Sequence, residues 1–480
     1  MVVLVFEEQV FSRARLDALT SGLARTLAGR GVRPGDRVAL MSSTRPEFII
    51  AVLACWRLGA AVVLLSPGWK HGDVAHALAV SEPSHAVGDH PVLAELMPML
   101  HLDEPIQPAD PVPGGYFTPD PAADAVLVFS SGTTGLPKAV RHTHASFAAA
   151  VGHWRDVLGM TAADRIQVAT PPSHILGILN IVTALETGAW MRLHRRFDLD
   201  ALLRSVQDDR ITIEMAVAPI ALAIASHPDL EAFDLSSLRF IMWGATPVTA
   251  SVAETVTRRT GVGWLPAYGA SELPVIACNP IGGARLDSVG KAAPGVELRV
   301  VDLDTGKPVG PGETGEIQGR SPSLMAGYLP EEANGEAFDD GWYRTGDVGN
   351  IDADGWVRLT DRRKEMIKVR GFQVAPAEVE AVLHGHPAVA DCAVFGVPDV
   401  ADGEAIIAVV TRAASSVARA TSDDTLATEL VSLVGERLAS YKRPRQVVFV
   451  PEIPRLASGK ALRRVLRDTV LAPEAPQGVE

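Results

Sequence analysis

The stretch that decides the fold is Ser130-Ser-Gly-Thr-Thr-Gly-Leu-Pro-Lys138. It directly follows an apolar run, residues 125–129, that predicts a buried strand. Its serines, threonines and glycines can surround phosphate oxygens with hydroxyls and backbone N–H groups, and Lys138 adds a positive charge. It is not the common P-loop, because the GxxxxGK[ST] spacing is missing and Pro137 precedes the lysine. On composition alone, a flexible surface turn is an equally good interpretation.

The composition is that of a globular protein with a large core. The chain has 480 residues, of which 47% are hydrophobic and 21% charged, and its length predicts about two to four domains. The net charge of -13 argues against nucleic acid and anionic lipid as partners. Cys55, Cys278 and Cys392 are too far apart to predict a disulfide framework or a zinc site.

No membrane or secretory segment is expected. The longest apolar stretch, residues 51–65, is interrupted by Arg57 and Gly59 and is too short to span a bilayer. The N-terminus has no basic region of the kind that opens a signal peptide. These features predict a cytoplasmic protein.

Apolar runs alternate with helical patterns through the first three quarters of the chain. This alternation predicts an α/β fold with layers and largely parallel sheets. The expected strands are residues 37–42, 61–65, 125–129, 213–218 and 238–243, and a helix is expected over residues 46–58 with Pro46 in its first turn.

The sequence becomes strongly charged near residue 361, and this change of composition predicts a domain boundary. A turn at 352–355, expected between two short strands, is followed by the charged run Asp361-Arg-Arg-Lys364. Beyond it, we expect helices over 376–384 and 425–438 and strands over 389–397 and 405–411. The proline-rich residues 103–124 and the Ala/Ser-rich residues 413–425 are expected to be loops. The prediction is a large domain, residues 1–361, and a small α+β domain, residues 362–480.

The loop at 130–138 resembles the signature of the adenylate-forming superfamily, which includes acyl-CoA synthetases, peptide-synthetase adenylation domains and firefly luciferase. Further matches follow in the superfamily's order over almost the whole chain, and they are most similar to the branch of 4-coumarate-CoA and fatty acyl-CoA ligases. Members usually carry a few more residues at the N-terminus. The resemblance implies that the small domain is mobile. It also implies that the protein is an ATP-dependent acid–thiol ligase that forms an acyl-adenylate and then an acyl-CoA thioester.

Several short motifs carry the residues that this resemblance assigns. Tyr268-Gly-Ala-Ser-Glu272 combines an aromatic ring for adenine with a carboxylate for Mg²⁺, and Ser271 stands where the family usually has threonine. Asp347 is implied as the ribose anchor and Arg362 as a ribose and phosphate contact, although Asp347 alone would suit a turn. The expected nucleotide-binding residues are Ser130, Ser131, Gly132, Thr133, Thr134, Gly135, Lys138, Gly244, Ala245, Tyr268, Gly269, Ser271, Asp347 and Arg362. Magnesium is expected at Glu272, with Thr133 as a second ligand.

The resemblance implies that some C-terminal residues act in the adenylation step and others in the step that uses coenzyme A. Lys460 is the expected adenylation lysine, since a cation between carboxylate and α-phosphate offsets their repulsion. Lys364 is the expected hinge, and Lys368, Gly371 and Gln373 are expected to contact coenzyme A. A solvated linker is the alternative for the charged run.

An apolar pocket is expected for the acid. Its residues are His174, Ile175, Gly177, Trp243, Gly244, Ala270, Leu273, Pro274 and Val275. His174 is expected to act near the carboxylate, with a satisfied core histidine as an equal alternative. No Asp occurs from 173 to 180, which argues against an α-amino acid. Trp243 is expected to narrow the pocket and favour a compact aryl or short- to medium-chain acid, unless it packs as ordinary core.

Three rivals stay open on the sequence alone. An acyl-AMP ligase that loads a carrier protein is disfavoured because the usual insertion is absent from 364–380. A luciferase-like oxygenase shares the same motifs. A non-catalytic nucleotide-binding regulator is disfavoured by the presence of Lys460, Glu272 and Asp347. A homodimer is compatible with the sequence, which does not name the acid.

Overall fold

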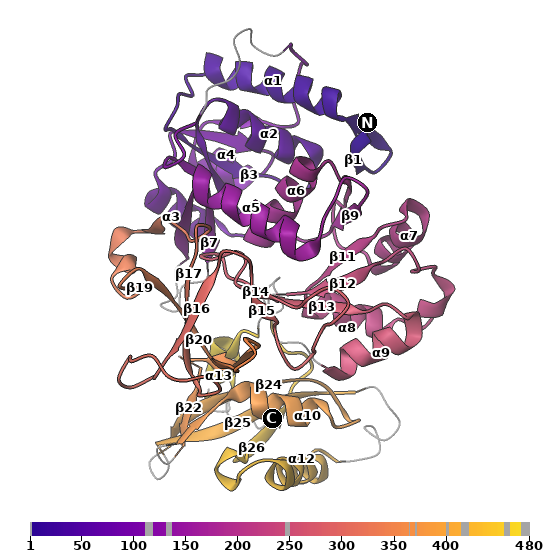
Figure 1. The fold of residues 1–480 in the computed structure, drawn as a ribbon, viewed down its shortest axis with the longest axis vertical. Coiled ribbons are helices and arrows are strands. Elements are labelled where there is room, and N and C mark those ends of the chain that lie inside the picture. Colours follow the sequence, from indigo (N-terminus) through magenta and orange to yellow (C-terminus); the bar gives the residue numbers. More distant parts are fainter. Residues whose placement is uncertain are drawn as a thin grey trace, which may run out of the picture.

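A computed structural model describes residues 2–110, 119–130, 137–244, 250–363, 365–369, 372–399, 403–413, 422–455 and 461–471. The N-terminal elements form the upper and middle part of the molecule in Figure 1, and the elements after residue 366 form a smaller unit at the bottom. The chain therefore folds into a large and a small α/β unit.

Among the described residues, the largest sheet has nine strands. Its order is β15 (Lys291–Ala292), β14 (Ala277–Cys278), β13 (Trp264–Tyr268), β12 (Phe240–Trp243), β11 (Ile213–Ala216), β9 (Arg165–Val168), β10 (Trp190–Leu193), β1 (Val2–Phe6) and β2 (Gln9–Ser12). The strands from β13 to β1 pair in parallel, and β14, β15 and β2 add antiparallel edges.

A second sheet, seven-stranded in the described residues, faces the first. Its order is β18 (Gly327–Leu329), β8 (Lys138–Thr143), β7 (Asp124–Ser130), β4 (Ala61–Leu65), β3 (Arg37–Met41), β5 (His85–Gly88) and β6 (Met99–His101). The strands from β7 to β6 pair in parallel, and β8 and β18 are antiparallel.

Helices lie between the two sheets and also cover their outer faces. One hydrophobic core joins both sheets to α1 (Arg13–Gly29), α2 (Pro46–Arg57), α5 (His144–Leu158) and α6 (Ile175–Thr187), so these helices form the middle layer. The outer faces are covered by α3 (His71–Ser81) and α4 (Pro91–Leu96) on the seven-stranded sheet, and by α7 (Leu199–Asp209), α8 (Ala218–Ser226) and α9 (Ala250–Thr260) on the nine-stranded sheet. This layering buries the Val/Ile/Leu-rich strands on both faces, as parallel strands require.

The end of the large unit differs from the expected parallel pattern. The strands β16 (Glu297–Val301), β17 (Gly315–Arg320), β20 (Trp342–Ile351), β19 (Phe338–Asp339) and β21 (Val357–Arg362) form an antiparallel sheet. The predicted turn at 352–355 connects β20 to β21. The two strands expected on either side of this turn are thus present, whereas β16, β17 and β19 were not predicted.

The small unit has its own cores. Its sheet contains β23 (Phe372–Val374), β22 (Ile367–Val369), β25 (Gly403–Arg412), β24 (Val389–Asp399) and β26 (Gln446–Phe449). The helices α10 (Pro376–His384), α12 (Asp423–Arg437) and α13 (Arg463–Leu471) pack on it. The hydrophobic clusters of the large unit end at Leu359 and those of the small unit begin at Ile367.

A buried polar network lies inside the nine-stranded sheet. Glu214 of β11 is 2% exposed, and its carboxyl accepts a hydrogen bond from the Gln167 amide of β9. The Gln167 Oε1 atom in turn accepts a hydrogen bond from His194, at 2.7 Å. Burial raises the pKa of Glu214 to about 8, and burial lowers the pKa of His194 to about 4. Both side chains are therefore neutral at pH 7.

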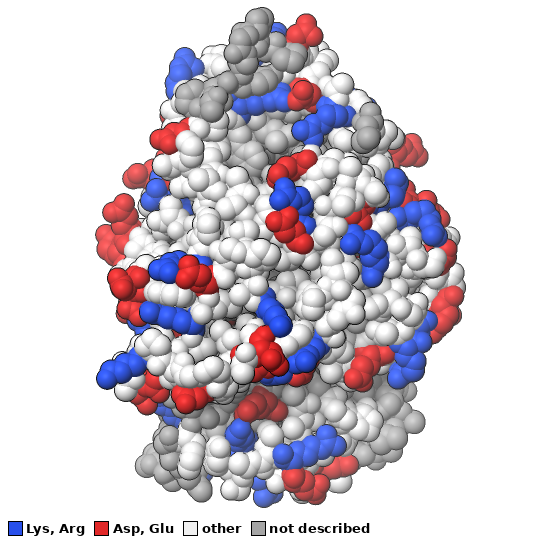
Figure 2. Space-filling model, in the orientation of Figure 1, with Lys and Arg blue, Asp and Glu red and all other residues white. Residues whose placement is uncertain are grey.

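The surface carries both signs of charge. On the face shown in Figure 2, acidic and basic side chains are interspersed between broad neutral areas. Of the helices in the described residues, none combines the length and apolar character needed to cross a bilayer.

Candidate nucleotide and acyl site

The strands β7 and β8 flank the predicted phosphate loop and form a hairpin. The strands β7 and β8 pair up to Ser130 and Lys138, which face each other across the ladder. Residues 131–136 between them lie outside the described residues, and these include the predicted Ser131, Gly132, Thr133, Thr134 and Gly135. The Nζ atom of Lys138 lies 5.1 Å from the ring centre of Tyr328, whose strand β18 pairs with β8.

A carboxylate is buried beside this lysine. Glu272 is 7% exposed, and its Oε1 atom accepts a hydrogen bond of 2.8 Å from the Tyr328 hydroxyl. Burial and the Glu272 charge raise the pKa of Tyr328 above its ordinary value, and burial with the same charge raises the pKa of Tyr343. Both phenols therefore stay protonated and can donate. Tyr328 was not predicted from the sequence, because its partner is far away in the chain and no local motif marks it.

A second carboxylate cluster joins two neighbouring strands. Asp347 of β20 pairs in register with Arg362 of β21, and Asp347 Oδ1 lies 2.8 Å from Arg362 Nε. The other carboxylate oxygen accepts a hydrogen bond from the Tyr268 hydroxyl. The Asp347 charge raises the pKa of Arg362, and Tyr268, Tyr343 and Glu272 add to this effect. The two carboxylates thus belong to one cluster, which unites the predicted Lys138, Tyr268, Glu272, Asp347 and Arg362.

Close backbone packing and a hydrogen bond to a backbone carbonyl fix the segment after Tyr268. A Cβ atom on Gly269 would lie 2.1 Å from the Pro274 carbonyl oxygen, so a side chain has no room there. His142, which is buried, holds the Ser271 carbonyl through its Nε2 atom at 2.7 Å. Burial lowers the pKa of His142, so that a neutral ring donates this bond. His142 is a supporting residue that sequence reasoning missed, since a single buried histidine gives no signal.

His174 stands at the start of α6. It is the N-cap residue, its side chain makes no capping hydrogen bond, and it is exposed. Surrounding protein atoms nevertheless displace part of its hydration and lower the pKa of His174 below its ordinary value. One turn later, a Cβ atom on Gly177 would lie 2.2 Å from the Pro171 carbonyl oxygen, so α6 approaches the preceding segment closely. The half-buried Ile175 lies between them.

The structure favours the core alternative for Trp243. Its side chain is 1% exposed and packs against Trp264 at 5.1 Å in the cluster under α8 and α9. The expectation that its indole narrows an acid pocket is therefore wrong for this conformation. Leu273 and Val275 are also fully buried core residues, and Pro274 is buried, whereas Ala270 is half-buried. Gly244 follows Trp243, and Ala245 lies outside the described residues.

The structure describes one of the predicted C-terminal side chains, that of Lys368. Lys364, Gly371 and Lys460 lie outside the described residues, as does the side chain of Gln373. Lys368 is exposed on β22, and its backbone N–H donates to Glu404 at 2.7 Å. The roles of these residues remain predictions.

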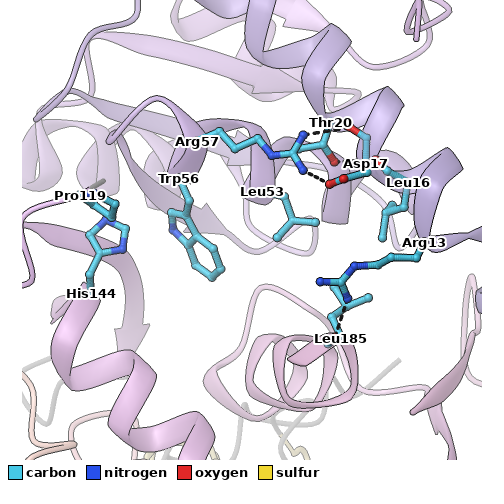
Figure 3. Close-up of a pocket in the computed structure, with 10 residues that line it drawn as sticks. All are labelled: Arg13, Leu16, Asp17, Thr20, Leu53, Trp56, Arg57, Pro119, His144 and Leu185. Atoms are coloured by element: carbon cyan, nitrogen blue, oxygen red, sulfur yellow. Dashed lines mark hydrogen bonds and ion pairs between the residues drawn. The ribbon is translucent and has the colours of Figure 1, made fainter. Parts of the chain in front are cut away.

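A cavity of about 320 Å³ lies elsewhere, among α1, α2, α5 and α6. Figure 3 shows Arg57 paired with Asp17 and Arg13 bound to the Leu185 carbonyl around an apolar centre with Trp56. None of its lining residues belongs to the predicted site. Within the described residues, no group of three or more His, Cys, Asp or Glu side chains is arranged to hold a metal ion.

The fold and the cluster define an adenylate-forming enzyme, and similar proteins agree. Residues 1–329 match the family described as AMP-binding enzyme, and residues 378–460 match its C-terminal domain. The chain is 34% identical to 4-coumarate–CoA ligase 1 from Oryza sativa subsp. japonica, over 95% of this chain and 87% of that protein.

Two solved structures share the whole fold. The o-succinylbenzoate CoA synthetase of Bacillus subtilis superposes with a TM-score of 0.87 at 30% identity, covering 97% of this chain and 95% of that chain. The amide bond synthetase of Marinactinospora thermotolerans superposes with a TM-score of 0.88 at 31% identity, covering 98% and 97%. The chain belongs to the AMP-binding enzyme family, and it is an AMP-forming enzyme of the acyl-CoA synthetase type. The expected fold class and family are confirmed.

Proposed function

We propose that this enzyme condenses ATP with an aryl or short- to medium-chain carboxylic acid and then transfers the acyl group to coenzyme A. In the first step, a carboxylate oxygen bonds to the α-phosphorus and pyrophosphate leaves. In the second step, the thiolate sulfur bonds to the acyl carbon and AMP leaves. The observation that carries the proposal is the cluster in which Lys138, Glu272 and Asp347 meet although they come from separate segments.

Each half of the cluster suits one part of the nucleotide. The bonds from Tyr268 and Arg362 fix the orientation of the Asp347 carboxylate, and a carboxylate is an acceptor that suits ribose hydroxyls, so we assign Asp347 to the ribose. Arg362 and Lys138 supply positive charge for the phosphates. Glu272 would hold Mg²⁺, which needs one or two carboxylates in addition to substrate phosphates and would neutralise phosphate charge when bound. The buried Glu272 carboxylate, oriented by Tyr328, fits this need.

The resemblance supplies the C-terminal half of the mechanism. Lys460 would bridge the acid and the α-phosphate during adenylation, and lysine suits this task as a point charge on a long stem. The small domain would then turn about Lys364 and present Lys368, Gly371 and Gln373 to coenzyme A. Such a rotation lets one site serve two transition states.

An aromatic acid is the preferred substrate class. With Trp243 packed in the core, this preference is supported by the names of two similar proteins, the 4-coumarate–CoA ligase and the o-succinylbenzoate CoA synthetase. Ala270 and the exposed His174 are the residues we assign to the acid, because they keep accessible or half-buried surface. A cytoplasmic location and a homodimer remain predictions.

The test is a pyrophosphate-release screen across aryl and alkyl acids, with and without coenzyme A. We expect acid-dependent release with at least one aryl acid, and an acyl-CoA product once coenzyme A is added. Lys460→Ala should abolish release, whereas Lys307→Ala, at an exposed loop position, should not. Undiminished release by the Lys460→Ala enzyme would refute the assignment.

A second acceptor deserves a matched assay, because one similar structure is an amide bond synthetase. Amines should be offered in place of coenzyme A, and an acyl carrier protein in a third arm. A product that forms with an amine or a carrier protein but not with coenzyme A would replace the proposed second step. Nucleotide binding without turnover of any acid would instead favour the non-catalytic regulator.

A further inference from the structure

The two residues beside position 364 are anchored to different units. Arg363 belongs to the large unit, since its guanidinium lies 2.9 Å from Glu316 of β17 and its backbone N–H donates to Gly346 of β20. Glu365 belongs to the small unit, since its carboxylate pairs with Arg463 of α13. The backbone N–H of Glu365 also donates to the Arg362 carbonyl at 2.9 Å, so the change from one unit to the other falls between Arg362 and Glu365.

Arg463 links Glu365 to other parts of the small unit. Besides Glu365, its guanidinium pairs with Glu380 of α10 at 2.8 Å, and the same Glu380 oxygen accepts a hydrogen bond from Val394 of β24. The arginine side chain is 18% exposed, so these charge pairs are partly shielded from water. Arg463 also stands three residues after Lys460 in the chain. Arg463 thus ties Glu365 to α10 and α13.

One side chain crosses from the large unit to the small unit. Asp361 pairs with Val348 in the β20–β21 ladder, yet its Oδ2 atom accepts a hydrogen bond of 2.8 Å from the Ala377 N–H of α10. The helix needs this acceptor. Its N-cap residue, Ala375, has no side-chain oxygen, and Pro376 has no N–H, so Ala377 carries the first N–H group of the helix. The carboxylate also complements the positive end of the helix dipole.

We propose that Asp361 is a positioning residue that holds the small unit in the orientation seen here by capping α10 across the hinge. Residues 361 and 377 lie on opposite sides of position 364, so a turn of the small unit separates the carboxylate from the helix. The cap therefore stabilises one orientation and is absent from the other. This inference rests on the proposed two-step function, in which each step uses its own orientation.

The supporting charges agree with this role. Burial raises the pKa of Asp361 to about 6, whereas the Arg463 charge and the Ala377 hydrogen bond act in the opposite direction. The carboxylate is consequently mostly ionised at pH 7. Three groups favour its charge, namely Arg463 and the Ala377 N–H of the small unit and the Arg362 N–H of its own strand, whereas the Glu365 charge opposes it. Loss of the contact would leave this half-buried carboxylate without the two favourable groups of the small unit.

Distance measurements test the cap directly. Spin labels at Glu254 of α9 and Glu436 of α12, both exposed, would report the spacing between the units, and the described cysteines are buried. We expect Asp361→Ala to change the ratio of the two orientations about tenfold, which corresponds to about 1.4 kcal/mol. Asp361→Asn, which keeps an acceptor without charge, should give a smaller change in the same direction. Asp354→Ala, an exposed position in the same hairpin, is the matched control.

The two half-reactions give a second readout. Acid-dependent pyrophosphate release and thioester formation from purified acyl-adenylate should change relative to each other by about tenfold in Asp361→Ala. An unchanged distance distribution, or equal losses in both half-reactions, would overturn the inference. If the unaltered enzyme releases no pyrophosphate with any acid, the proposed function fails while the distance measurement still decides the cap. The near-isosteric Asp361→Asn variant keeps both readouts available if the alanine variant does not fold.

Discussion

Replacing Glu214 by glutamine should change how the stability of the large unit depends on pH. Burial raises the pKa of Glu214 from 4.5 to about 8, so the folded state keeps a proton that the unfolded chain has already released. The extra stability is complete below pH 4.5 and is lost as the pH rises through about 8, because the folded state binds the additional proton in between.

The size of the effect follows from this window. One additional bound proton corresponds to about 1.4 kcal/mol per pH unit, so the free energy of unfolding should fall by about 2 kcal/mol between pH 6 and pH 7.5. Glutamine does not titrate and removes this contribution. His194, the other titratable member of the network, stays neutral throughout the interval because its pKa is lowered to about 4.

Thermal unfolding of both proteins at pH 6 and pH 7.5 measures the difference. For a domain of this size, 1 kcal/mol shifts Tm by about 1–2 °C, so the difference in Tm between the proteins should change by about 2–4 °C. The exposed Glu254→Gln variant controls for removal of any one carboxylate. Parallel pH profiles for the unaltered protein and Glu214→Gln would show that Glu214 is ionised in the fold and would refute the reasoning.

Three further substitutions probe the site. Tyr328→Phe removes the donor to Glu272 and should lower kcat/KM for ATP about tenfold, in line with the loss of a hydrogen bond to a charged group; an unchanged value would separate Tyr328 from the nucleotide site. Gly269→Ala forces a contact with the Pro274 carbonyl and should cost about 2 kcal/mol or more in thermal unfolding, and an unaltered Tm would contradict the tight approach. Asp347→Asn should raise the KM for ATP about tenfold or more with little change in Tm; normal saturation by ATP would argue against a ribose contact.

Continuous apolar strands were the most predictable part of the fold. Residues 61–65 form β4 with the predicted bounds, and the helix expected from Pro46 ends within one residue of α2. The strand expected over 213–218 ends at Ala216, because Pro219 lies in the first turn of α8, where its fixed φ angle suits a helix. Local sequence therefore located the buried strands but misplaced several of their ends by one or two residues.

The site was predictable where the chemistry follows a local motif. Tyr268, Glu272, Asp347 and Arg362 were all identified from short segments, and the structure brings them into one cluster. Tyr328 was not, because its role depends on β18 pairing with β8, a contact between distant segments. No pattern in a single sequence reports which side chains a long-range strand pairing will bring together.

Strand alternation divides the residues of β12 between two faces of the sheet. The Trp243 ring points into the cluster beneath α8 and α9, while Met242 belongs to the core that contains α6. Gly244 is the next position, and a Cβ atom there would touch the flexible Met242 sulfur at 3.3 Å. A library designed to alter acid preference should therefore vary Gly244 together with Ala270 and leave the tryptophan unchanged, because mutations at that ring would reduce protein yield before they altered selectivity.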